Sequence, residues 1–350
     1  MNHLTSWSDL PDSAWASCLA RARRHRAERA WGDAARGKAI GLVFLNPSLR
    51  TRASMELAAH HLGATPFVLT PGQGAWGLEW RDGVPMDGAA AEHVREAVGV
   101  LSRYADALGV RTFATLADYD ADHADAAFRA IVDAATVPVV NLESARWHPC
   151  QALADAATLD DRFGGQARGK KLVLSWAPHP KALPQAVPNS ALLMAARLGM
   201  EVVVARPDGF ALAPDVMALA RTAAARAGGS VSESADRDVA FMGADVVYAK
   251  AWSGALVYDD PPREAAQRAG HADGWRVTAS AMRHTNRAAL MHCLPVRRGV
   301  VVDAEVLDGP DALHLLQAEY RLHAQKAILE WVWELGGADR GARNAGGAGA

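Results

Sequence analysis

Cysteine is scarce in this sequence. Among 350 residues only Cys18, Cys150 and Cys293 occur, far apart along the chain. This spacing lacks the close pairs typical of zinc sites and the density typical of disulfide-stabilised folds. The sequence therefore predicts neither a disulfide framework nor a zinc site, and we expect no metal and no cofactor.

Long hydrophobic runs are also missing, as is an excess of charge of one sign. No apolar run approaches the length of a membrane span, and the amino terminus lacks the basic-then-apolar pattern of a secretory signal. The formal net charge of −2 gives no reason to expect nucleic acid or an anionic membrane as a partner. We therefore expect a cytoplasmic protein in which local positive charge belongs to a binding site.

Strand-like runs alternate with helical patterns along the whole chain, which predicts an α/β fold of two doubly wound parallel-sheet domains. The length also suggests about two domains. We expect a first domain over 1–150, a second over 151–318, a last helix over 319–335 that packs back on the first domain, and a disordered tail over 336–350. The predicted strands are 39–45, 66–69, 107–110, 137–142, 171–176, 202–204, 246–248 and 289–292.

Residues 44–52 mark the transition from the first strand to a helix. Ser48 is the expected N-cap, and the free N–H groups of Leu49, Arg50 and Thr51 would face any anion at the helix start. The macrodipole and the arginine charges add to this attraction. The segment therefore predicts a phosphate or carboxylate site, although a capped helix with solvent-facing arginines fits the local sequence equally well.

Three further polar segments follow predicted strands: Arg111, residues 148–151 and residues 292–298. Ligands of open α/β sheets bind outside the carboxyl ends of the strands, so these segments are expected to converge with residues 48–52. Each segment alone is also compatible with a structural role, and Arg297-Arg298 with a solvated surface. Their common position is what favours a binding site.

These motifs carry a family resemblance. Ser48-Leu49-Arg50-Thr51-Arg52 resembles the Ser-x-Arg-Thr-Arg signature of the aspartate/ornithine carbamoyltransferase family. His148-Pro149-Cys150-Gln151 is similar to its His-Pro-x-Gln motif, and His292-Cys293-Leu294-Pro295 to the His-Cys-Leu-Pro of its ornithine branch. Residues 319–327 resemble the closing helix of that branch. The resemblance implies a carbamoyltransferase with its active site in a cleft between a carbamoyl-phosphate domain and an amine domain.

The resemblance also implies roles for individual residues. Thr51, Arg111 and His148 would stabilise the oxyanion that forms when an amine attacks the carbamoyl carbon. No covalent intermediate is required, so Cys150 and Cys293 need not be nucleophiles. The carbamoyl phosphate ligands implied are Ser48, Leu49, Arg50, Thr51, Arg111, His148, Gln151 and Arg297, with Trp76 from a neighbouring subunit.

Lys250 departs from the pattern of the ornithine enzymes. They carry an Asp that pairs with the free α-ammonium of ornithine, whereas this chain has Lys250 after the strand 246–248. Two like charges in contact repel, so the α-amine of the substrate is expected to be blocked. The chain resembles the N-acylornithine carbamoyltransferases of arginine biosynthesis, and residues 72–76 and 86–88 resemble the elongated loop of that branch. The resemblance implies a homotrimer with Trp76 reaching across the interface; the alternative is that Trp76 packs on its own domain.

Ala91 and Val301 bear on the acyl group. Acetyl-specific members carry a Glu where this chain has Ala91 and a Lys where it has Val301. A Glu would repel a succinyl carboxylate, so Ala91 favours N-succinyl-L-ornithine over N-acetyl-L-ornithine, with ordinary ornithine third. The candidate amine-substrate residues are Glu143, His179, Lys250, Cys293, Leu294 and Ala91.

Two other classes of protein compete with this interpretation. A nicotinamide-dependent dehydrogenase would need a Gly-x-Gly-x-x-Gly after the first strand of a domain, and neither domain has one. A non-catalytic binding protein would have a damaged anion site or lack His148, and both are intact. Product formation from carbamoyl phosphate and a set of amines distinguishes all three.

Overall fold

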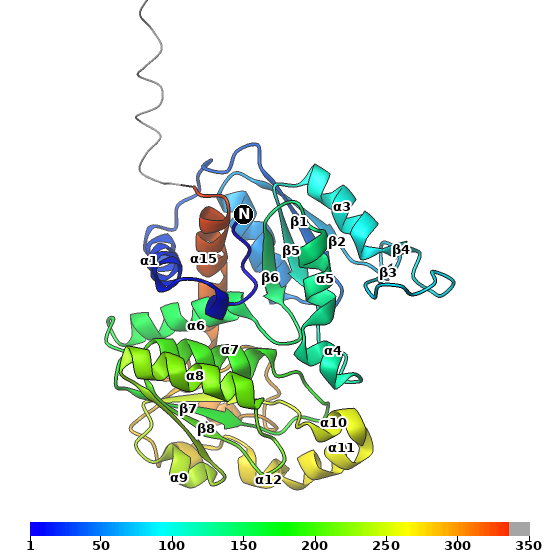
Figure 1. Ribbon diagram of the computed structural model, residues 1–350. Helices are drawn as coiled ribbons and strands as arrows, with labels where there is room; N and C mark the ends of the chain where they lie inside the picture. The colour runs from blue at the N-terminus through cyan, green and yellow to red at the C-terminus, as the bar shows by residue number, and fades with distance from the viewer. Residues whose placement is uncertain (336–350) are drawn as a thin grey trace, which may run out of the picture.

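The computed structural model describes residues 1–335; the predicted disordered tail lies outside the described residues. Two parallel sheets stand one above the other, each with helices on both faces (Figure 1). The first sheet has the order β2-β1-β5-β6 and the second β11-β10-β7-β8-β9. The strands are β1 Ala39–Phe44, β2 Thr65–Leu69, β5 Ala107–Arg111, β6 Val139–Glu143, β7 Lys171–Trp176, β8 Glu201–Ala205, β9 Ser230–Ser234, β10 Val246–Lys250 and β11 Ala289–Met291. The predicted α/β class with two parallel sheets is confirmed.

In both sheets, helices lie between successive parallel strands along the chain, as the crossover connections of a parallel sheet require. The first part of the chain contains η1 Trp7–Asp9, α1 Asp12–Glu28, α2 Arg50–His61, α3 Val94–Tyr104, α4 Tyr119–His123, α5 Ala126–Ala134 and α6 Pro149–Arg162. The second part contains α7 Ala186–Arg197, α8 Pro214–Ala227, α9 Arg237–Phe241, α10 Leu256–Asp259, α11 Pro261–Gly270, α12 Ala272–Trp275, α13 Ala279–Met282, α14 Ala304–Leu307 and α15 His314–Val332. No helix among residues 1–335 is long and apolar enough to cross a membrane.

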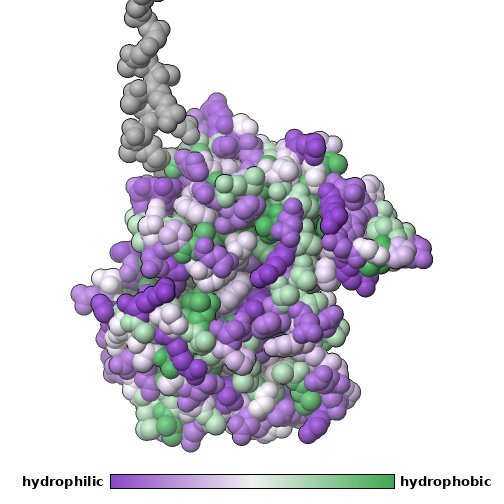
Figure 2. Space-filling model, in the orientation of Figure 1, coloured by the Kyte–Doolittle hydropathy of each residue, from purple (hydrophilic) through white to green (hydrophobic). Residues whose placement is uncertain are grey.

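The first sheet is buried on both faces, which explains its nearly uncharged strands. Along β1, Ile40, Leu42 and Phe44 point into one core cluster together with residues of α1, α2, α6 and α15. Val43 points the other way, into a second cluster formed with α3 and α5. The alternation follows from the two-residue period of a strand. On the face shown in Figure 2, hydrophilic side chains are interspersed with apolar ones over both sheets' domains.

Helix α15 begins at His314, five residues before the predicted start, and runs along the first domain beside α1 (Figure 1). Lys326, although buried, donates from Nζ to Ala30 O at 2.7 Å. Helix α15 therefore packs against the domain that contains the first residues of the chain. The division of the chain near residue 150 itself stays a prediction.

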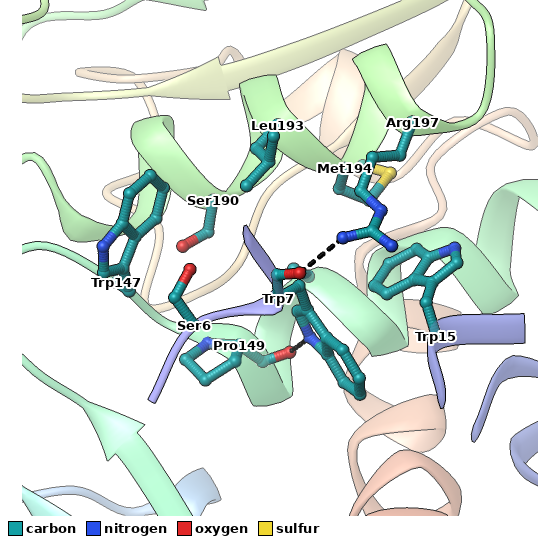
Figure 3. Close-up of a pocket in the computed structure, with 10 residues that line it drawn as sticks. Ser6, Trp7, Trp15, Trp147, Pro149, Ser190, Leu193, Met194 and Arg197 are labelled. Atoms are coloured by element: carbon teal, nitrogen blue, oxygen red, sulfur yellow. Dashed lines mark hydrogen bonds between the residues drawn. The ribbon is translucent and has the colours of Figure 1, made fainter. Parts of the chain in front are cut away.

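The start of α6 is fixed by a junction between the amino-terminal segment and the second domain (Figure 3). Trp7 Nε1 donates to Pro149 O at 2.8 Å, and the guanidinium of Arg197, on α7, donates to Trp7 O. Ser190 Oγ accepts a hydrogen bond from His148 N at 2.7 Å. The turn that carries His148 is thus held from both domains.

Several local features differ from expectation. The helix after β1 begins at Arg50 with Leu49 at the N-cap position, so the predicted N-cap, Ser48, is one residue early. Its hydroxyl still accepts a hydrogen bond from Thr51 N at 3.2 Å. The loop over 70–88 forms part of a small parallel pair, β3 Leu78–Glu79 with β4 Glu92–His93. Strand β9 was not predicted because its sequence, Ser-Val-Ser-Glu-Ser, is polar and lies at an exposed sheet edge.

Candidate functional site

A cavity of about 730 Å³ lies where the carboxyl ends of the strands of both sheets face each other. It is reached by the segments after β1, β5, β6, β10 and β11, the position expected for a ligand site in this architecture. Twelve predicted site residues line it: Ser48, Leu49, Arg50, Thr51, Arg111, Glu143, His148, Gln151, His179, Lys250, Cys293 and Leu294. The expected convergence of the four polar segments is therefore observed, whereas the role of each residue stays a prediction.

The start of α2 forms one wall of the cavity. Thr51 N is bonded to Ser48 Oγ, and Thr51 itself is buried. Burial lowers the pKa of Arg50 from its usual value, yet leaves it far above neutrality as expected for a guanidinium. A permanent cation thus stands at the positive end of a helix dipole, which attracts a dianion such as a phosphate group.

Arg321, on α15, completes this wall and was not among the predicted site residues. Its guanidinium donates to Gln151 Oε1 at 2.8 Å and to Thr51 Oγ1 at 3.0 Å, and it lies 3.5 Å from His148 Nε2. It is buried and lines the cavity. The available signal was its place within residues 319–327, which resemble the family's closing helix.

Arg111, Glu143 and His148 form a buried group at the ends of β5 and β6. The Arg111 guanidinium is hydrogen-bonded to Glu143, and His148 Nε2 lies 3.4 Å from the same carboxylate oxygen. Burial, and then the charges of Arg321, Arg111 and Arg50, hold the pKa of His148 well below its usual value. The imidazole is therefore neutral at physiological pH and serves as an uncharged hydrogen-bond donor or acceptor.

The opposite wall belongs to the second domain. Lys250 is 9 % exposed and donates from Nζ to Ala251 O at 2.8 Å. His292 Nδ1 accepts from Leu294 N at 2.9 Å, which leaves the proton on Nε2. Burial lowers the pKa of His292 to about 3, so this ring is also neutral. The wall offers one cation and one neutral N–H donor, with Val301 beside them.

His179 and Arg297 lie at the edge of the cavity. His179 lines it, and Arg297 Nε lies 3.1 Å from His179 Nε2, while the His179 carbonyl is held by Arg268. Arg297 is not itself part of the lining, although it contacts His179, which is.

Trp76 and Ala91 lie outside the cavity, on the loop that contains β3 and β4. Trp76 is 60 % exposed, and its Nε1 donates to Glu92 Oε2 at 2.6 Å. Thr70 and Gln73, at the base of the same loop, do line the cavity. Within one chain the loop tip therefore points away from the site.

Positive charge prevails in the cavity. Five cationic side chains are opposed by the single carboxylate of Glu143 among the lining residues: Arg50, Arg52, Arg111, Lys250 and Arg321. A cleft with this balance concentrates anionic ligands. Among residues 1–335 no group of three or more His, Cys, Asp or Glu is placed to hold a metal ion.

Comparison with known proteins agrees with these features. The carbamoyl-P binding domain of aspartate/ornithine carbamoyltransferase matches residues 2–161, and the Asp/Orn binding domain of the same family matches residues 184–332. The chain is 43% identical over 303 residues to N-acetylornithine carbamoyltransferase of Xanthomonas axonopodis pv. citri, covering 85% of this chain and 87% of that protein. It is 36% identical over 335 residues to N-succinylornithine carbamoyltransferase of Bacteroides thetaiotaomicron, covering 95% and 99%.

A solved structure is equally similar. It is a variant of N-acetyl-L-ornithine transcarbamylase with one glutamate replaced by alanine, complexed with carbamyl phosphate and N-succinyl-L-norvaline. The TM-score is 0.91 at 40% sequence identity, covering 94% of this chain and 99% of that one. This chain belongs to the aspartate/ornithine carbamoyltransferase family, within its N-acylornithine branch.

Proposed function

We propose that the enzyme transfers the carbamoyl group of carbamoyl phosphate to the δ-amine of N-succinyl-L-ornithine, giving N-succinyl-L-citrulline and phosphate in arginine biosynthesis. The observation that carries the proposal is Lys250, a buried cation that lines the cavity where an ornithine enzyme needs an anion. A free α-ammonium would be repelled there, whereas a carboxylate or an acyl oxygen would be bound. The second candidate is N-acetyl-L-ornithine, favoured by the higher identity to the Xanthomonas enzyme.

The first-domain wall supports the carbamoyl phosphate half of the reaction. The phosphate would lie at the start of α2, against the N–H groups of Leu49, Arg50 and Thr51 and the guanidinium of Arg50. Gln151 would address the carbamoyl end. These groups neutralise phosphate both before and after it leaves, so departure does not expose a bare dianion.

Thr51, Arg111 and His148 would act on the carbamoyl oxygen. As the δ-amine attacks, negative charge develops on that oxygen, and preorganised donors in a dry site stabilise it. His148 suits the task because the N–H of its neutral ring can donate a hydrogen bond without adding a further positive charge to the site. The amine attacks only when it is neutral, so the rate of the chemical step should rise with pH on the alkaline side. A pH-independent single-turnover rate would contradict this step.

Ala91 and Val301 support the succinyl assignment. Ala91 lies outside the cavity of its own chain, on the loop that we propose reaches a neighbouring subunit. It stands where acetyl-specific members carry a Glu, and an Ala there removes a charge that would repel the second carboxylate of a substrate bound in that subunit. The solved structure of the acetylornithine enzyme with N-succinyl-L-norvaline is that of a variant in which one glutamate is replaced by alanine. This supports the proposal that a small residue in place of a glutamate is compatible with a succinyl group. Val301 adds an apolar surface to the cavity instead of a second ammonium.

Product analysis of the purified enzyme tests the assignment. Carbamoyl phosphate is supplied with N-succinyl-L-ornithine, N-acetyl-L-ornithine, L-ornithine or L-aspartate, and the ureido product and phosphate are quantified. We expect kcat/KM to be highest for the succinyl compound and lowest for free ornithine among the ornithines. A preference for free ornithine would contradict the role given to Lys250, and a preference for the acetyl compound would select the second candidate.

We also propose a homotrimer in which Trp76 of one subunit reaches the carbamoyl phosphate of its neighbour. The exposed indole and its tether to Glu92 present the ring away from its own cavity. Trp76→Ala and Arg50→Met subunits, each inactive alone, should regain activity when dissociated and reassembled together, since some sites then combine an intact Trp76 with an intact Arg50. Mixtures that stay inactive, or a monomer by sedimentation, would contradict the proposal.

A further inference from the structure

Asp155 is a fully buried carboxylate one helical turn beyond Gln151 on α6. Three side chains from three elements donate to it. Gln151 Nε2 and Gln317 Nε2 donate to Oδ1 at 2.7 and 2.9 Å, and Tyr248 OH donates to Oδ2 at 2.8 Å. All three donors are neutral. Burial raises the pKa of Asp155 to about 6, which is the cost of keeping a carboxylate in this place.

The orientation of Gln151 depends on this carboxylate. A glutamine amide has an NH2 end and an oxygen end, and the group that meets one end decides where the other points. Oδ1 of Asp155 is only an acceptor, so it takes the NH2 end, and Gln151 Oε1 is turned to Arg321 at 2.8 Å. Arg321 in turn is bonded to Thr51. The Asp155 carboxylate therefore decides which end of the Gln151 amide faces Arg321, and through Arg321 it is connected to Thr51 at the start of α2.

Gln317 extends the same logic to the second domain. Its NH2 end is fixed by Asp155, which turns its oxygen to accept from the backbone N–H of His292 at 2.8 Å. His292 immediately precedes Cys293 and Leu294, which line the amine side of the cavity. Tyr248, the third donor, lies on β10, two residues before Lys250. One carboxylate is thus connected to both walls.

We propose that Asp155 is a positioning residue for both substrates: it orients Gln151 toward Arg321 and, through Gln317, fixes the backbone that precedes Cys293. This role rests on the proposed function, because it assumes that carbamoyl phosphate binds at the wall of the cavity that contains Gln151 and Arg321. Asp155 touches neither substrate and takes no proton in the reaction.

The proposal depends on Asp155 Oδ1 as a hydrogen-bond acceptor and not on the charge of the carboxylate, so the test variant must remove the acceptor. Asp155→Leu keeps the shape of the side chain and removes the acceptor from both amides. Asp155→Asn is the conservative counterpart, since its oxygen still accepts from Gln151 and Gln317 while its NH2 donates to the Tyr248 oxygen. Thr158→Val, a nearly isosteric change at a buried residue of the same helix, is the matched control for the cost of altering α6.

KM and kcat for each substrate are measured for the four proteins, with the affinity for carbamoyl phosphate alone by calorimetry. We expect Asp155→Leu to raise the KM and Kd for carbamoyl phosphate by about 10-fold or more, because two amides lose their common acceptor. For Asp155→Asn and Thr158→Val, the KM and Kd for carbamoyl phosphate should stay within about 3-fold of the wild-type values, because both variants keep an acceptor for Gln151 and Gln317 at position 155. A lower kcat for Asp155→Leu with unchanged KM and Kd would mean a merely structural role and would overturn the proposal.

A second variant covers the amine side and the case in which Asp155→Leu does not fold. Gln317 does not line the cavity, and Gln317→Met removes its hydrogen bonds to Asp155 Oδ1 and to His292 N while Gln151 keeps its own bond to Asp155. We expect the KM for the amine to rise about 5-fold, because the backbone before Cys293 loses its acceptor, with the KM for carbamoyl phosphate within about 2-fold. A folded variant with both KM values unchanged would overturn the link. A wild type without ureido product would refute the proposed function separately, since calorimetry with carbamoyl phosphate still tests Asp155.

Discussion

The two walls of the cavity are built in different ways. The wall that we propose binds phosphate begins with four consecutive residues, 48–51, at the start of α2, so its geometry follows from the backbone of a single segment. The opposite wall, which we propose binds the amine, is assembled from Lys250 at the end of β10 and from residues 292–294 and Val301 in the connection after β11. We therefore expect single substitutions to change the choice of amine more readily than the binding of the phosphate donor.

The electrostatics of the walls differ as well. On the side proposed to bind phosphate, half-buried Arg50 and buried Arg321 are permanent cations beside neutral His148. On the amine side, Lys250 is the cation of the described wall and His292 stays neutral. We expect substitutions on the phosphate side to abolish activity with every amine, and those on the amine side to change the choice among amines.

Arg50→Met should have the largest effect. Loss of this charge should lower kcat/KM for carbamoyl phosphate by about 10³-fold, comparable to the loss of a strong anion-stabilising group in other enzymes. Initial rates with each ornithine derivative measure it, and the loss should be the same for all of them. The matched control is Arg36→Met, an arginine of the same domain whose side chain is 80% exposed. A decrease in kcat/KM with only one of the amines would contradict the proposal that this wall binds the phosphate donor and the opposite wall selects the amine.

Lys250→Met should have the next largest effect. Removal of the ammonium should lower kcat/KM for N-succinyl-L-ornithine by about 100-fold, equivalent to one charge-assisted interaction, and should raise it for free ornithine. Competition between the two amines in one reaction mixture measures the change of preference directly. The affinity for carbamoyl phosphate should hardly change. An equal loss for both amines would show that Lys250 supports the site without selecting the substrate.

His292 should make the folded state sensitive to acid. The unfolded imidazole takes up a proton near pH 6.5, while the folded one stays neutral down to a pKa of about 3, so its contribution to stability decreases as pH falls below 6.5. At pH 5 this amounts to about 2 kcal/mol of unfolding free energy. Urea unfolding at pH 7.5 and pH 5, at one protein concentration, should show a smaller pH effect in His292→Gln than in the wild type.

The control for this experiment is His60→Gln, at an exposed position of α2. Its pH effect should match that of the wild type. If His292→Gln also matches the wild type, the acid sensitivity of the protein arises elsewhere.

Ala91→Glu should have the smallest effect and the most specific one. A carboxylate at this loop position should lower kcat/KM for N-succinyl-L-ornithine by about 10-fold through repulsion of the second carboxylate, with little change for N-acetyl-L-ornithine. The ratio of the two kcat/KM values is the quantity to measure. Ala89→Glu adds the same charge to a neighbouring exposed residue of the loop and should leave the ratio unchanged. A ratio unaffected by Ala91→Glu would remove Ala91 from the specificity determinants.

Structural elements that depend on a short segment of the chain could be predicted from the sequence. The strands β1, β5 and β7 were predicted to within one residue, because apolar runs of strand length bounded by polar residues have few other interpretations. The helix start after β1 was predicted from the polar residues 48–52, and the anion site there stays a prediction. The polar edge strand β9 was missed, since nothing in its sequence requires a buried sheet.

Arg321 and His292 show why the rest of the site was harder to predict. Arg321 lies 270 positions from Thr51, its partner, so only the folding of the whole chain brings them together. The neutral state of His292 follows from burial and from nearby cations on other segments. The position of Trp76 relative to a neighbouring subunit depends on an assembly that one chain does not contain.

The bond between Arg321 and Thr51 has a consequence for synthesis of the protein on the ribosome. The segment around Thr51 is made early, but the guanidinium that completes it arrives 270 residues later, roughly 15–50 s afterwards at ~5–20 residues per second. A nascent chain released before α15 is made would carry the signature motif without its guanidinium partner. The side-chain contacts at the start of α2 are therefore complete only after α15 has been made.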